Sequence, residues 1–111
     1  METTRQQKIA RLIQKDLGNI FQKSGHLFDG ALVTVTKVQV ARDLSFAKVW
    51  LSLFTKGDKA KLMEAIRSKG KEIRHLLGNA ERNQLRIIPE LQFLEDDSLD
   101  YIENIENLLK H

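Results

Sequence analysis

The chain opens with an amphipathic pattern that predicts a helix over about residues 4–21. Its apolar side chains recur every three or four positions, which is the spacing of one helical face. They are Ile9, Leu12, Ile13, Leu17, Ile20 and Phe21. Thr3 with Gln6, and Thr4 with Gln7, have the spacing of a capping box, in which a hydroxyl and a glutamine side chain satisfy free backbone groups at a helix start. We therefore expect this helix to begin at the threonines and to pack one face on a core.

Two runs of β-branched and aromatic residues come next and predict a hairpin. Residues 31–40 and 46–54 have strand composition and are bounded by polar turn residues. Only residues 41–45 separate them, and so short a connection favours antiparallel pairing. Trp50 lies in the second strand, and we expect it to face the core.

A second apolar stripe predicts a helix from about Asp58, its N-cap, to about Leu77. Gly70 interrupts the stripe, and a glycine inside a helix costs about 1 kcal/mol relative to alanine. We therefore expect a kink or break there. Gly78 and Asn79 are typical of a helix C-cap and predict that the helix ends before them.

Residues 85–93 also have strand composition, but Pro89 has no N–H to donate to a sheet, so we expect an edge or bulged strand. The Asp-Asp-Ser sequence at 96–98 is a competent cap for a last helix that continues to about Leu109. With 111 residues, the chain is most simply one domain, residues 1–111. The predicted fold class is α+β, in the order α-β-β-α-(kink)-α-β-α, with a three-stranded sheet packed on helices.

Composition excludes several classes of protein. Without cysteine there is no disulfide, thiolate nucleophile or cysteine-based zinc site. No apolar run is long enough to cross a membrane and no secretory signal precedes the first helix, so we expect a cytoplasmic protein with no membrane partner. Phosphate-loop, dinucleotide and H-E-x-x-H motifs do not occur, and the three histidines lack a partnering motif. We therefore predict that the protein is not an enzyme, with no catalytic residue, metal site, cofactor or small-molecule substrate.

The net charge of +3 hides an asymmetry along the chain. Residues 1–80 carry 15 basic and 7 acidic side chains, whereas residues 81–111 carry 3 basic and 8 acidic ones. A basic body with an acidic end indicates a polyanionic partner for one surface. We interpret the acidic end as helix capping followed by a solvated face, and not as a metal site.

The positive charge is densest on the kinked helix, where residues 56–74 carry seven basic and three acidic side chains. A kink exposes a helix N-terminus, whose N–H groups and dipole favour a phosphate. The candidate RNA-binding residues at the kink are Arg67, Ser68, Lys69, Gly70, Lys71 and Arg74. A second basic line, on the first helix, comprises Lys8, Arg11 and Lys15. Ordinary solvated helix faces are the alternative for both sets.

Aromatic platforms for stacking bases are scarce in this sequence. Trp50 is the one candidate that the pattern offers, and we assign it to the core. Binding to the backbone of structured RNA is therefore favoured over base-by-base recognition.

Specific stretches of the sequence resemble the ribosome-binding factor A family. They are residues 5–9, residues 43–52 and, above all, the Leu-Arg-Ile-Ile-Pro-Glu-Leu-Gln-Phe stretch at 85–93, followed by Asp-Ser-Leu at 97–99. The resemblance covers essentially the whole chain, and the predicted order of elements is similar to that of a type II KH-like domain.

The resemblance implies a bacterial assembly factor that binds the immature small (30S) ribosomal subunit and its 16S rRNA. Such proteins support late maturation, including processing of the 16S rRNA 5′ end, and growth at low temperature, and they act by binding. They carry an Ala-x-Gly helix break in place of the Gly-x-x-Gly loop of other KH domains, and its nearest equivalent here is Ser68-Lys69-Gly70. The family tends to be basic just after this helix, where this sequence has Arg82 and then Arg86.

A protein-interaction adaptor is the competing hypothesis. It would dock a partner chain through its acidic last helix or through the edge strand around Pro89. In either case we expect a monomer.

Overall fold

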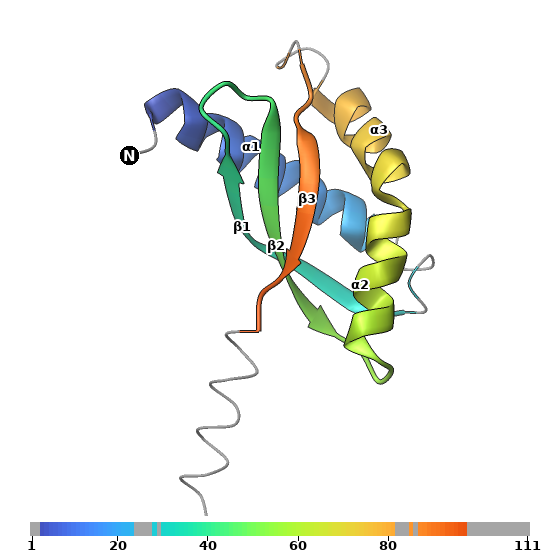
Figure 1. Cartoon of the computed structure of the whole chain (residues 1–111). Helices are drawn as coiled ribbons and strands as arrows, with labels where there is room; N and C mark the ends of the chain where they lie inside the picture. Colours follow the sequence, from blue (N-terminus) through green and yellow to red (C-terminus); the bar gives the residue numbers. More distant parts are fainter. Residues whose placement is uncertain (1–2, 24–27, 29, 82–84, 86, 98–111) are drawn as a thin grey trace, which may run out of the picture.

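The computed structural model describes residues 3–23, 28, 30–81, 85 and 87–97 (Figure 1). Over these residues the fold is α+β, as predicted. The elements in chain order are α1 (Thr4–Lys23), β1 (Leu32–Val40), β2 (Phe46–Phe54), α2 (Lys59–Ser68), α3 (Gly70–Glu81) and β3 (Glu90–Glu95). The predicted last helix lies outside the described residues.

The three strands form one sheet in the order β1-β2-β3. β1 and β2 pair antiparallel, which confirms the predicted hairpin, and β3 runs parallel to β2 at the edge. A parallel neighbour requires the chain to cross over before it re-enters the sheet, and α2 and α3 make this crossover. α1 crosses behind the sheet, and the face turned toward the viewer in Figure 1 carries no helix.

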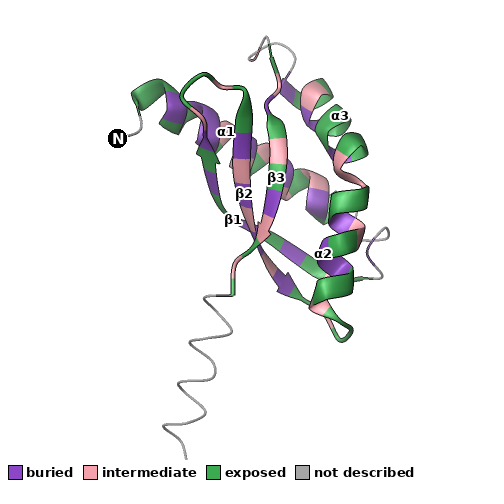
Figure 2. Cartoon of the chain, viewed as in Figure 1, coloured by how far each residue is buried: buried purple, intermediate pink, exposed green. Residues whose placement is uncertain are grey.

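Burial alternates along the hairpin and defines an inner and an outer face of the sheet (Figure 2). The buried side chains of the two strands form the inner face and join the helices in one core. They are Val33, Val35, Val38, Val40, Ala47, Val49, Leu51 and Leu53. A β-bulge between Val35 and Lys37 shifts the alternation along β1 by one residue, so that the buried positions change from 33 and 35 to 38 and 40.

Trp50 lies on the outer face of the sheet, so its predicted place in the core is wrong. Its neighbours Val49 and Leu51 are fully buried, and alternation turns the side chain between them the other way. The ring is half-buried because Lys37 on β1 and Leu94 on β3 flank it. The Lys37 ammonium lies over the ring, 5.1 Å from its centroid.

Both predicted helix starts that the described residues can test are confirmed. The Thr3 N–H donates to Gln6 Oε1 at 2.9 Å and the Gln6 N–H donates to Thr3 Oγ1 at 3.1 Å, which is a complete capping box. Gln6 also donates through Nε2 to the Val40 carbonyl at 3.0 Å, and so ties the start of α1 to the end of β1. At α2, the Ala60 N–H donates to Asp58 Oδ1 at 2.8 Å.

Two predicted boundaries are wrong. α3 continues through Gly78 to Glu81 instead of ending near residue 77, and Gly78 lies beside Ile88, whose Cγ1 would be 3.5 Å from a Cβ there, an ordinary contact distance. The last strand begins at Glu90 and not at residue 85, because Pro89 has no N–H. The first donor of the strand is the Glu90 N–H, which bonds the Ser45 carbonyl at 3.0 Å.

Candidate nucleic-acid interface

The break between α2 and α3 falls at Lys69, one residue before the predicted glycine. Lys69 has φ −94° and ψ 9°, outside the helical range. Its N–H donates to the carbonyls of both Ala65 and Ile66 at 3.1 Å, and its carbonyl accepts from the Ile73 N–H at 3.0 Å. The chain therefore changes direction at Lys69 while its backbone hydrogen bonding continues across the break.

Two arginines of the helix pair bind the backbone of the edge strand and of the segment before it. Arg67 donates through Nε and Nη2 to the Phe93 carbonyl, at 3.4 and 3.1 Å. Arg74 donates through Nε to the Pro89 carbonyl at 3.2 Å and through Nη2 to the Ile88 carbonyl at 2.7 Å. These bonds hold β3 against the helices, and they leave fewer free carbonyls at the sheet edge for a partner strand.

Both guanidinium groups also remain available to a ligand. Arg67 and Arg74 are exposed residues, and each guanidinium has five N–H donors, of which these bonds use two. Their charges are therefore fixed in position beside the break before any partner arrives. Such preorganisation lowers the entropy lost on binding.

The remaining candidate residues at the break differ in whether their side chains already have a partner within the protein. Lys71 is exposed, and no described residue forms an ion pair with it. Lys69 Nζ lies 3.9 Å from Glu72 Oε1, an exposed pair of little energetic weight. The Ser68 hydroxyl donates to the Ala65 carbonyl at 2.7 Å, so its proton is already used. A Cβ on Gly70 would meet nothing within 4 Å, so the backbone there is open to solvent.

Two shallow hollows lie along the side of the molecule where the helix pair meets β3. One of about 340 Å³ is lined by Arg67, Gly70 and residues 91–93. The other, of about 370 Å³, is lined by Lys71, Arg74, His75 and Ile88. We call the basic residues and the glycine at this junction the kink surface. It comprises Arg67, Lys69, Gly70, Lys71 and Arg74.

The basic residues predicted on the first helix are exposed but belong to another part of the molecule. Lys8, Arg11 and Lys15 lie on α1, whose N-terminal end projects beyond β1 in Figure 1. The helices α2 and α3 lie toward the opposite edge of the sheet, beyond β3. Lys8 lines a hollow with Arg5 and Arg42, at the hairpin turn, and not with the kink surface. Arg82 and Arg86, the other two predicted RNA-binding residues, lie outside the described residues.

Sequence patterns missed one buried ionisable group. Glu81, the last residue of α3, is completely inaccessible to solvent. Burial, and secondarily the carboxyl group of Asp16 on α1, raise the pKa of Glu81 to about 8 from its usual 4.5. The sequence predicts that this helix ends near residue 77. Glu81 therefore lies outside the predicted apolar stripe, and nothing in the pattern indicates that it is buried.

Among the described residues, no group of three or more potential ligands is arranged to hold a metal ion. No helix in the described part of the chain is both long and apolar enough to span a membrane.

The family model for ribosome-binding factor A matches residues 5–109. The chain belongs to the ribosome-binding factor A family. Among its relatives, ribosome-binding factor A of Cytophaga hutchinsonii is 43% identical over 110 residues, which cover 98% of this chain and 83% of the relative. That of Flavobacterium johnsoniae is 46% identical over 113 residues, covering 98% and 85%. The predicted membership is confirmed, and the protein is a ribosome-binding factor by family.

Solved structures of the ribosome-binding factor A family share the fold. The crystal structure of the Thermus thermophilus protein has a TM-score of 0.66 at 21% identity, covering 81% of this chain and 94% of that one. The solution structure of a putative member from Thermotoga maritima has a TM-score of 0.64 at 23% identity, covering 88% and 92%. A homology model of the Thermus thermophilus protein, fitted into a cryo-EM map of a 30S complex, has a TM-score of 0.60 at 24% identity, covering 78% and 89%.

Proposed function

We propose that this protein binds the small (30S) ribosomal subunit and its 16S rRNA as an assembly factor. Membership of the ribosome-binding factor A family supports this proposal, as does the relative fitted into a map of a 30S complex. The observation on this chain that carries it is the kink surface, where two arginines are held by backbone carbonyls beside two exposed or half-exposed lysines.

On this proposal the kink surface meets the phosphate groups of folded rRNA. A planar guanidinium suits a phosphate through paired N–H donors, and the lysines add mobile positive charge. Contacts of this kind orient a protein on RNA without selecting a base sequence. Lys8, Arg11 and Lys15, with Arg82 and Arg86, would extend the contact to further rRNA segments.

The role of the protein in subunit maturation would depend on binding and not on catalysis. We propose that the protein acts as a monomer in the cytoplasm, supports late maturation of the subunit, and promotes processing of the 16S rRNA 5′ end. It would do so by stabilising one rRNA conformation for other enzymes, and it would matter most at low temperature, where misfolded RNA rearranges slowly. It contributes no catalytic group on this proposal.

Sucrose-gradient sedimentation of cell extract tests the proposal. The wild-type protein should travel with immature small subunits. The double variant Lys69→Glu/Lys71→Glu should shift to the top of the gradient, because it reverses two charges without touching the arginines that hold β3. A strain that lacks its own copy should recover mature 16S 5′ ends with the wild type and not with this variant.

Lys23→Glu/Lys56→Glu is the matched control. It makes the same change in charge at two exposed lysines outside the kink surface, and it should sediment as the wild type does. Equal loss in both double variants would mean that net charge alone governs association. Retention of the Lys69→Glu/Lys71→Glu protein on the subunit would show that the kink surface is not the interface.

A further inference from the structure

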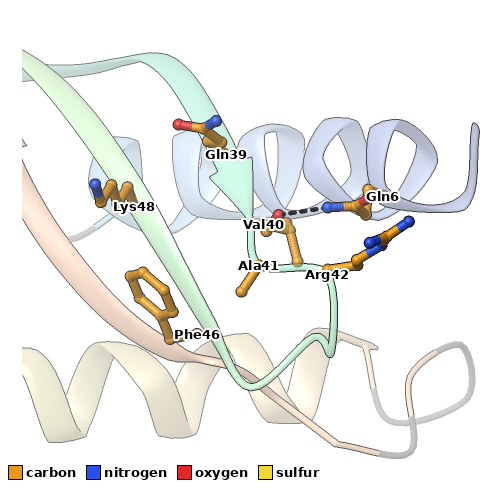
Figure 3. Close-up of a pocket in the computed structure, with 7 residues that line it drawn as sticks. All are labelled: Gln6, Gln39, Val40, Ala41, Arg42, Phe46 and Lys48. Carbon is orange, nitrogen blue, oxygen red and sulfur yellow. Dashed lines mark hydrogen bonds between the residues drawn. The ribbon is translucent and has the colours of Figure 1, made fainter. Parts of the chain in front are cut away.

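A hollow of about 420 Å³ lies where the hairpin turns, lined by residues of both strands and by Gln6 of α1 (Figure 3). This volume lies in the range of sites that hold small molecules or single nucleotides. The hollow is separate from the kink surface, and none of the predicted RNA-binding residues lines it. The lining residues are Gln6, Gln39, Val40, Ala41, Arg42, Phe46 and Lys48.

Phe46 supplies a partly exposed aromatic ring at this hollow. Its side chain points to the outer face and is 37% exposed, which is high for a phenylalanine in a strand. The Ala41 N–H donates to the Phe46 carbonyl at 2.8 Å, so the backbone closes the hairpin without help from the ring. Exposed rings in such positions are platforms on which a flat ligand stacks.

Polar groups that are free to bind also line the hollow, although the Arg42 side chain points away from the ring, toward Gln6 (Figure 3). Gln39 on β1 stands opposite Lys48 on β2 in the register of the sheet. No described residue hydrogen-bonds the side chain of Gln39, Lys48 or Arg42. Gln6 is different, because its amide is committed to Thr3 and Val40. The hollow therefore offers one free amide, with a donor and an acceptor, and two cations.

The side chains that line the hollow are basic or uncharged, and the exposed Glu90 on β3 stands opposite Phe46 just outside it. Asp43, which follows Arg42 in sequence, accepts hydrogen bonds from the Ser45 hydroxyl at 2.7 Å and the Ser45 N–H at 3.1 Å, and these bonds lower the pKa of Asp43. That carboxylate is thus held within its own turn. An aromatic ring beside an unpaired cation suits a ligand that is flat and anionic.

We propose that this hollow binds one unpaired nucleotide of RNA, with its base stacked on Phe46, its base edge on the Gln39 amide, and a flanking phosphate at Lys48. The proposal rests on the proposed function, since it assumes an RNA partner. It adds a base-binding site on a different face from the kink surface. A base within a duplex has both faces covered, so the site selects single-stranded RNA.

Trp50 does not serve as a second platform of this kind. The Lys37 ammonium already lies over its ring, and the ring is half-buried between two neighbouring strands. Phe54, at the far end of the same strand and on the same face, is 75% exposed but does not line the hollow. Exposure alone therefore does not define the site, and Phe54 offers a matched control for Phe46.

Fluorescence anisotropy with a labelled, unstructured RNA of about ten nucleotides, at fixed salt, tests the proposal. Phe46→Ala should weaken binding roughly 5- to 100-fold, the range of one base stacked on an aromatic ring. Phe46→Tyr keeps the ring and should bind within about twofold of wild type. Phe54→Ala should bind as wild type does. An RNA of the same length without bases should bind wild type and Phe46→Ala equally.

Other results would contradict the proposed nucleotide site at the hollow. If Phe46→Ala binds the RNA as wild type does, or if Phe54→Ala loses as much, the hollow is not a nucleotide site, whatever the kink-surface variants do on sucrose gradients. If Phe46→Ala keeps its RNA affinity but leaves the subunit, the hollow binds a ribosomal protein instead. If the wild type binds neither RNA nor subunit, the proposed function fails as well. Thermal melting by circular dichroism checks that both alanine variants fold.

Discussion

Arg67 and Arg74 combine two roles that a sequence pattern assigns to different residues. Each lies on an exposed helix face and each donates two hydrogen bonds to backbone carbonyls near β3. Replacing either arginine would remove charge and also leave part-buried carbonyls without donors. Lost RNA binding in such a variant would not separate the two effects. Lys69 and Lys71 are the cleaner probes of the kink surface because neither bonds the sheet.

Glu81 carries a prediction about stability and pH. The pKa of its buried carboxyl is raised to about 8 in the folded protein, whereas it is near 4.5 when exposed. The folded state therefore retains a proton that the unfolded state releases. The protonated Glu81 carboxyl therefore contributes to the stability of the folded state. This contribution is fully present below about pH 4.5 and is lost as pH rises toward 8. The free energy of unfolding should fall by up to about 1.4 kcal/mol per pH unit in this window.

Urea unfolding at several pH values across this window measures the effect. Glu81→Gln has a neutral side chain of nearly the same shape at every pH, so its stability should depend less on pH and should exceed that of wild type near pH 8. Asp43→Asn, at a fully exposed turn, is the control and should keep the wild-type slope above about pH 5. An unchanged slope in Glu81→Gln would mean that Glu81 is ionised in the folded state.

At the scale of elements, the helix break does not depend on glycine. The non-helical backbone is that of Lys69. Gly70, the first residue of α3, has no positive φ and has open space where a Cβ would stand. The break instead lets α2 and α3 each turn an apolar side into one core, through Leu62, Met63 and Ile66 and through Ile73 and Leu77. Tertiary packing thus sets the kink.

Gly70→Ala should accordingly stabilise the protein by up to about 1 kcal/mol, because alanine loses less backbone entropy on folding. Gly30 is a matched contrast: it also has open space at its Cβ, but its φ is +76°, where a side chain is strained. Gly30→Ala should be destabilising. Urea unfolding of both variants measures the difference, and destabilisation by Gly70→Ala would show that the break requires glycine after all.

At the scale of the whole molecule, the kink surface and the Phe46 hollow differ in chemistry as well as in position. The first lies where the helices meet β3, and the second lies where the hairpin turns. On the two proposals, the first surface would contact phosphates through charge, whereas the second would add base stacking. The basic excess of residues 1–80 is thus distributed over more than one surface.

Salt dependence should separate the two surfaces. Each phosphate contact contributes about −0.7 to −0.9 to the slope of log affinity against log salt concentration. Lys69→Ala/Lys71→Ala should therefore make the slope for RNA binding shallower by roughly 1.4 to 1.8 if both lysines contact phosphates. Phe46→Ala should lower affinity at every salt concentration without changing the slope, because stacking releases no counterions. Anisotropy titrations at several salt concentrations provide both values.

Local chemistry accounts for what could be predicted from the residues. A capping box at Thr3 and Gln6 and an N-cap at Asp58 act within four residues of themselves, so their spacing alone reveals them. Family membership was likewise predictable, because the stretch at 85–93 is specific. Pro89 placed the last strand at an edge correctly. The start of that strand was placed too early, since composition outweighed the missing N–H.

The misplaced residues are those whose surroundings come from distant parts of the chain. Gly78 was predicted to end a helix that in fact continues to Glu81, and Trp50 was predicted in the core although the strand register turns it outward. The local sequence dictates caps, periodicity and net charge, because these depend on near neighbours. Other features arise only when separate segments of the chain meet, so they depend on the tertiary structure. They are the hydrogen bond from Arg67 to Phe93, the burial of Glu81 and the hollow beside Phe46.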